Sequence, residues 1–102
     1  GATALARSKY FGALENLLLE NENWIHAEGA KSLASSTAFP KLRQLVLTLN
    51  AIGDDGAFYL AEAKNFTALE QLNVAGNKIS PRGEDALRNS INLQHLKILE
   101  LV

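Results

Sequence analysis

Hydrophobic residues recur along this chain at one long and regular interval. In one copy of the pattern the shared positions hold Leu42, Leu45, Leu47, Asn50, Ile52, Gly56 and Leu60. The next copy has the same internal spacing and holds Leu69, Leu72, Val74, Asn77, Ile79, Gly83 and Leu87. A later copy begins with Leu96, Leu99 and Leu101, and the copy that precedes Leu42 begins with Leu14, Leu17 and Leu19 and contains an inserted residue. So many coincident positions indicate an internal repeat, and repeats of this length stack into solenoids.

The start of each repeat has the pattern of a β-strand. Leu45 and Leu47 alternate with other residues, as expected of a strand with one buried face. Equivalent strands are expected at residues 16–20, 44–48, 71–75 and 98–102. Strands this short are not stable alone, so each must stack on its neighbours.

The remainder of each repeat predicts helices and a packed core. Alanines that let helices lie close to the strands are Ala30, Ala34, Ala57 and Ala61. Phe39 and Phe66 are expected to fill the core under the returning loops. Asn50 and Asn77 follow the strands where the chain turns inward, and we expect their amides to bond buried backbone groups.

Two sequence features mark the starts of helices. Ser80 followed by Pro81 is typical of a helix N-terminus, with serine as the N-cap and proline at the first helical position. Asp54 and Asp55 suit the N-terminal end of the preceding helix, because negative charge there is stabilised by the helix dipole.

The pattern LxxLxLxxNxIxxxGAxxLA resembles the leucine-rich repeat of the ribonuclease-inhibitor type, and the resemblance covers essentially the whole chain. The regular spacing of its repeats is more similar to bacterial members. The resemblance implies an α/β solenoid with short parallel strands on a concave face, helices on the convex face, and a role in protein recognition. We expect one domain over residues 1–102, with partial repeats at 1–13 and 96–102 and full repeats at 14–41, 42–68 and 69–95.

The chain offers little for catalysis or for binding a metal. It has no cysteine, so disulfides and thiolate metal sites are excluded. His26 and His95 are more than two repeats apart and lack zinc-binding spacing. Asp54 and Asp55 lack calcium-loop spacing, and the glycines form no phosphate-binding motif. We therefore expect no enzymatic activity, no cofactor and no metal.

Charge and hydropathy argue against nucleic acid and membrane as partners. The formal net charge is -1, which gives no electrostatic footprint for nucleic acid. Lysines and arginines are interspersed with acidic residues, as on an ordinary solvated surface. No apolar run has the length of a membrane helix, and the first residues do not have the pattern of a signal peptide. These features do not determine the cellular compartment of the protein, and the cytoplasm is favoured.

Alternation within the strands selects the residues that would face a partner on the concave side. These are Asn16, Leu18, Glu20, Gln44, Val46, Thr48, Gln71, Asn73, Ala75, Ile98, Glu100 and Val102. Leu18, Val46 and Ile98 are apolar at positions that water would otherwise reach. Amides and apolar groups together form a mixed strip of the kind found at the core of recognition surfaces. The alternative is that the strip is simply tolerated, because single exposed apolar residues are common.

Three aromatic residues are further candidates. Trp24 lies in a loop of the one repeat with an inserted residue, where it either forms a binding hot spot or shields its own repeat. Phe58 and Tyr59 adjoin buried helix positions, and lateral packing between helices is the favoured interpretation for them.

Neither end of the repeat array carries a polar cap. The sequence starts inside a helical segment and finishes with the apolar residues Leu99 and Leu101, whereas solenoids usually cover their terminal repeats. We therefore consider three hypotheses besides simple partner binding: a fragment of a longer array, self-association by strand addition, and a targeting segment of a larger enzyme.

We predict that Trp24→Ala weakens binding of a partner protein by about 2 kcal/mol or more, because tryptophan is enriched among interface hot spots. Titration calorimetry of both chains against the same partner measures the loss. Circular dichroism of both chains is the folding control, and equal affinity with equal folding would refute the hot-spot role.

Overall fold

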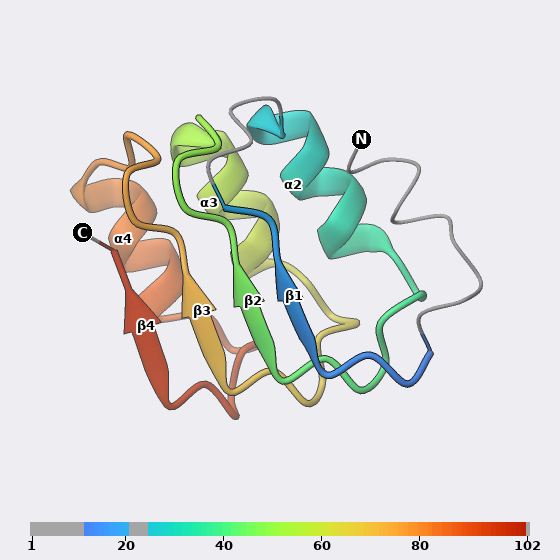
Figure 1. The fold of residues 1–102 in the computed structure, drawn as a ribbon. Helices are drawn as coiled ribbons and strands as arrows, with labels where there is room; N and C mark the ends of the chain where they lie inside the picture. Colours follow the sequence, from blue (N-terminus) through green and yellow to red (C-terminus); the bar gives the residue numbers. More distant parts are fainter. Residues whose placement is uncertain (1–11, 21–24, 102) are drawn as a thin grey trace.

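A computed structural model of the chain describes residues 12–20 and 25–101. Within them, strands and helices alternate, and the elements are β1 (Asn16–Leu18), α2 (His26–Ser35), β2 (Gln44–Val46), α3 (Gly53–Ala61), β3 (Gln71–Asn73), α4 (Pro81–Arg88) and β4 (Ile98–Glu100). The four strands form one sheet, and the three helices lie side by side as a second layer on one face of it (Figure 1).

The sheet is parallel throughout, and its strands follow the order of the sequence. Leu17, Leu45, Leu72 and Leu99 stand in register across the four strands. The predicted stacking of repeats is thereby confirmed, because equivalent leucines of successive repeats become neighbours.

The strands are shorter than expected. Each has three residues, so the prediction of five-residue strands was too long by two at the C-terminal end. The chain turns there, with a positive φ of 58° at Leu49 and of 54° at Ala51. Backbone pairing still extends past the regular strands, because Leu19 N donates to Val46 O and Leu47 N donates to Asn73 O.

One continuous core lies between the sheet and the helices. The leucines Leu45 and Leu72 are fully buried, and so are the predicted core aromatics Phe39 and Phe66. The predicted alanines are buried as well. Glycine recurs at position 56 for a steric reason. A Cβ on Gly56 would lie 2.6 Å from Ile52 Cβ, so only glycine lets this turn of α3 lie so close to Ile52.

Two buried asparagines, Asn50 and Asn77, each join their repeat to the preceding one. Asn77 is 1% exposed, and its side chain bonds five backbone groups, namely Asn50 N, Ile52 N, Leu47 O, Val74 O and Ala75 O. Asn50 is also buried and donates to Leu19 O and Thr48 O. These bonds confirm the structural role predicted for both asparagines.

The start of α4 is bonded to α3 rather than capped by its own serine. Ser80 occupies the N-cap position and Pro81 follows it, as predicted, but the Ser80 hydroxyl makes no bond to its own helix. It donates instead to Asp54 Oδ2 at 2.6 Å, and Ser80 N donates to Asp54 Oδ1 at 2.7 Å. Asp54 lies in the first turn of α3, so one carboxylate ties together the N-termini of two helices. The Ser80 hydroxyl, followed by the Ser80 N–H, holds the pKa of Asp54 below its ordinary value.

We predict that Asn77→Ala lowers the free energy of unfolding by about 3 kcal/mol or more, because several buried backbone groups lose their partner and each costs about 1–3 kcal/mol. Urea denaturation measures the change. Asn65→Ala is a matched control, since Asn65 is half-buried and donates one bond to Ser35 O. A loss equal to that of the control would contradict the prediction.

We also predict that Ser80→Ala flattens the acid side of the stability profile. The lowered pKa of Asp54 means that its stabilisation is present above the ordinary value and is lost as pH falls through the lower folded value. Without the serine hydroxyl this loss shrinks, and urea midpoints measured below about pH 4 should depend less on pH. A urea midpoint that depends on pH as steeply in Ser80→Ala as in the unaltered chain would contradict this prediction.

Candidate protein-binding surface

The face of the sheet away from the helices, here called the open face, brings most of the predicted residues together. Alternation in three-residue strands leaves two outward positions per strand. Their registers form two rows, Asn16–Gln44–Gln71–Ile98 and Leu18–Val46–Asn73–Glu100. Eight predicted residues from four separate repeats therefore share one continuous surface.

Exposure across the open face is uneven. Leu18 is 56% exposed and Ile98 is 45% exposed, so the outer strands do present apolar groups to water. Val46 is 5% exposed, and the prediction that it faces water was wrong. It lies on a central strand between Leu18 and Asn73 in register, where side chains on both sides shield it.

Polar side chains on the open face bond one another across strands. Gln44 Nε2 donates to Gln71 Oε1 at 3.3 Å, and Asn73 Nδ2 donates to Glu100 Oε2 at 2.8 Å. Asn73 Oδ1 also accepts from Ala75 N. These bonds restrict the side-chain rotamers, so less conformational entropy is lost when a partner binds.

The remaining predicted residues lie outside the strands. Glu20 and Thr48 occupy turns after β1 and β2, so their predicted place within strands was wrong, because the chain bends earlier than the alternation suggested. Ala75 also lies in a turn. Trp24 and Val102 lie outside the described residues.

One exposed apolar residue near these turns was not predicted. Leu49 is 47% exposed and has a φ of 58°. The equivalent position one repeat later is Gly76, where an added Cβ would lie 2.6 Å from Leu49 Cδ2. The pairing of a leucine with a glycine at the same repeat position could have drawn attention to Leu49.

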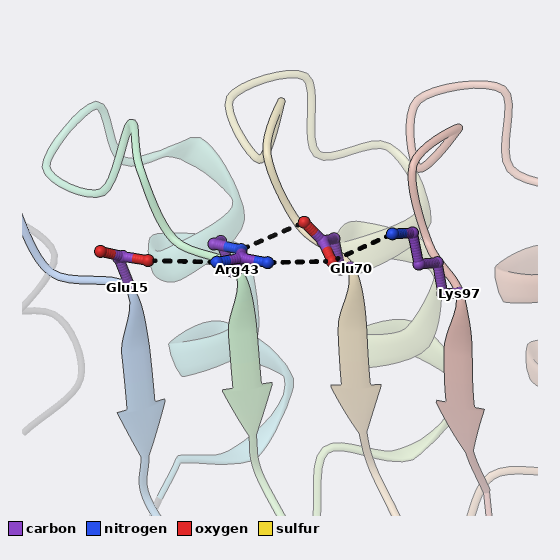
Figure 2. Close-up of polar contacts among 4 residues, drawn as sticks. All are labelled: Glu15, Arg43, Glu70 and Lys97. Carbon is purple, nitrogen blue, oxygen red and sulfur yellow. Dashed lines mark hydrogen bonds and ion pairs between the residues drawn. The ribbon is translucent and has the colours of Figure 1, made fainter.

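Four charged residues form a row immediately before the strands. Figure 2 shows Glu15, Arg43, Glu70 and Lys97 side by side, with alternating charge. Arg43 Nη1 lies 3.5 Å from Glu15 Oε1, Arg43 Nε lies 3.1 Å from Glu70 Oε2, and Lys97 Nζ lies 3.5 Å from Glu70 Oε1. The cations are thus interspersed with acidic residues, as predicted, and the repeat interval places these four side chains in register.

The charged row alters the acid–base behaviour of its central members. The hydrogen bond from Arg43, followed by its charge, lowers the pKa of Glu70. The same hydrogen bond with Glu70, reinforced by its charge, raises the pKa of Arg43. Both side chains thus stay charged at neutral pH, and the row presents fixed charges along one end of the sheet.

The helical face shows aromatic packing between helices. Lys31 Nζ of α2 lies 5.5 Å from the Tyr59 ring centroid, and the Arg82 guanidinium carbon of α4 lies 6.0 Å from that of Phe58. Both rings belong to α3 and are half-buried. Their contacts with the flanking helices agree with the lateral packing predicted for them.

Within residues 12–20 and 25–101, no group of three or more histidine or acidic side chains is placed to hold a metal ion. His26 is exposed at the start of α2, and His95 is exposed in the turn before β4. Among the described helices, none has the length and apolar character required to cross a membrane.

Comparisons with known proteins agree with this architecture. The sequence model of the family described as Leucine Rich repeat matches residues 40–61 and 67–87. The tropomodulin C-terminal domain of Caenorhabditis elegans is similar in structure, with a TM-score of 0.72 and 20% sequence identity over 98% of this chain. The fold is that of a leucine-rich-repeat protein. The chain spans 61% of that tropomodulin domain. No curated protein matches the sequence.

Leucine-rich-repeat domains generally act in protein–protein interaction and are generally not enzymes. In this chain, the described residues form a specific surface that is available for such an interaction. They present an open sheet face with exposed apolar groups, cross-bonded amides and a neighbouring row of fixed charges.

Proposed function

We propose that the chain binds a partner protein on the open face of its sheet, which the repeat pattern predicts to be concave. The observation that supports this proposal most directly is the pair of registered rows in which Leu18 and Ile98 flank Gln44, Gln71 and Asn73. Burial of the apolar groups favours binding, and hydrogen bonds to the amides orient the partner protein. No cofactor takes part.

The chemistry of the open face limits the kind of partner. Its central residues are apolar or amide, and Glu100 at one edge is bonded to Asn73. A strongly charged partner would gain little there, because interaction energy at the core of such a surface comes from burying apolar and aromatic groups. The proposed partner therefore offers an apolar patch surrounded by hydrogen-bonding groups. Leu49, exposed in the turn after β2, is proposed to extend this site. Trp24 stays the binding hot spot expected from the sequence.

We further propose that the repeats are of the ribonuclease-inhibitor type and divide at residues 14–41, 42–68 and 69–95. Each of these units holds one strand and one α-helix, and the helices have 10, 9 and 8 residues. A full helix in every repeat supports this subtype. One domain over residues 1–102 is part of the same proposal.

We predict that replacing Leu18 and Ile98 together by glutamate weakens partner binding about tenfold or more, because two charges must then be desolvated at the interface. Ile91→Glu is the matched control, since Ile91 is 78% exposed on the α4–β4 connection, away from the open face.

The measurement compares three immobilised baits, the unaltered chain, the double variant and the control, against the same cell extract. A protein retained by the unaltered chain and by Ile91→Glu, but lost from the double variant, supports the open face. Equal retention by all three baits, each shown to be folded by circular dichroism, excludes it.

A further inference from the structure

Two exposed side chains occupy positions where the next repeat has glycine. Gly53 and Gly76 have positive φ values of 63° and 72°, a left-handed backbone that glycine adopts without steric cost. The residues at the same positions one repeat earlier are His26 and Leu49, and they keep this backbone with φ values of 56° and 58°. A side chain in this conformation costs free energy, because its Cβ crowds the following carbonyl oxygen. The chain therefore keeps a histidine and a leucine where glycine would fit the backbone better.

The two positions lie close together in the fold. His26 N, at the start of α2, donates to Asn50 O at 3.0 Å, and Asn50 directly follows Leu49 in the chain. The same bond recurs one repeat later, where Gly53 N donates to Asn77 O. The repeat thus places the backbones of His26 and Leu49 beside each other, next to the end of β2.

Packing within the chain does not account for either side chain. His26 is exposed, and at the equivalent Gly53 an added Cβ would meet no atom within 4 Å. Leu49 extends over Gly76, where its Cδ2 occupies the space that a Cβ would need, yet Leu49 is still 47% exposed. Backbone strain of this kind collects at functional sites, where it is part of how the site works. We therefore expect both side chains to contact a group outside the chain.

This pair adjoins the open face. Leu49 follows Val46 by three residues, which places it within about 11 Å of the row that Val46 shares with Leu18 and Asn73. The turn is also fixed to the next repeat, because Leu49 N donates to Ala75 O at 3.1 Å. A protein bound on the open face can therefore extend over this turn without any rearrangement of the turn.

We propose that His26 and Leu49 together form a specificity-determining contact for the partner protein of the open face. This inference rests on the function proposed above. Leu49 selects an apolar group, and the neighbouring imidazole of His26 can bond a polar one. The matching surface of the partner is therefore an apolar side chain flanked by a hydrogen-bonding group, and a protein that lacks either is discriminated against.

Substitution by glycine separates a role in binding from a role in the fold. His26→Gly and Leu49→Gly permit the same left-handed backbone and remove only the side chain. The urea midpoint of each should be no lower than that of the unaltered chain, because relief of the backbone offsets any packing that is lost. A lowered midpoint would assign the side chain to the fold and would overturn the proposal.

Ala51→Gly is the matched control. Ala51 is exposed in the same turn and has a φ of 54°, so this substitution makes the same backbone change and removes only a methyl group. Its urea midpoint should likewise be no lower than that of the unaltered chain, and its affinity for the partner should be unchanged.

Binding is measured with the protein that the unaltered chain retains from the cell extract, after that protein has been identified by mass spectrometry and purified. Calorimetric titration should show that His26→Gly and Leu49→Gly each bind it about tenfold more weakly, as expected for residues central to an interface. Unchanged affinity in both variants, or an equal loss in Ala51→Gly, would overturn the proposal.

The double glutamate variant of Leu18 and Ile98 distinguishes failure of this contact from failure of the open-face function. Weak binding by the double variant alone rejects the contact and keeps the open face. Weak binding by His26→Gly and Leu49→Gly alone rejects the open face and supports the contact. An unaltered chain that retains no protein rejects both.

Discussion

Every repeat of this protein must satisfy the polar backbone groups where its strand ends and the chain turns into the core. In the two described repeats that begin at Leu42 and Leu69, Asn50 and Asn77 meet this constraint across the repeat boundary. Asn77 bonds Leu47 O and Asn50 N of the preceding repeat as well as Val74 O of its own. Because unpaired buried groups are costly, the repeats can stack only in the register that makes these bonds. The aligned leucines, the two rows of the open face and the charged row all follow from that register.

The sequence was sufficient to predict this architecture because the constraint recurs at a constant interval. A repeat unit that carries leucine, asparagine and glycine together at fixed positions allows one chain path per repeat and one neighbour relation between repeats. Leu45 beside Leu72 and Leu99 is the direct consequence. Gly56 recurs for a local reason, since Ile52 leaves no space for a Cβ. Periodicity therefore encodes both the stacking and the close contacts within each unit.

Details of the candidate surface were less predictable, because alternation gives the direction of a side chain but not what covers it. Val46 points outward and is still buried, since it has neighbours on both sides, whereas Leu18 and Ile98 lie on outer strands. Leu49, in the turn after β2, has a positive φ and is exposed, although the pattern assigned it no role. The bond from Ser80 to Asp54 could not be predicted from the sequence, because it depends on how close the N-termini of α3 and α4 lie to each other.

The charged row could have been read from the sequence once the repeat interval was applied to charged residues as well as to leucines. Its energetic role follows from its exposure. Ion pairs at a surface contribute about 0–1 kcal/mol, too little to hold repeats together. Their effect is on selectivity, because alternating charge penalises a strand that pairs one repeat out of place. Lys97 beside Arg43 would repel, while Lys97 beside Glu70 attracts. In a chain whose backbone and leucines are nearly identical in every repeat, this charge pattern distinguishes the correct neighbour from its near copies.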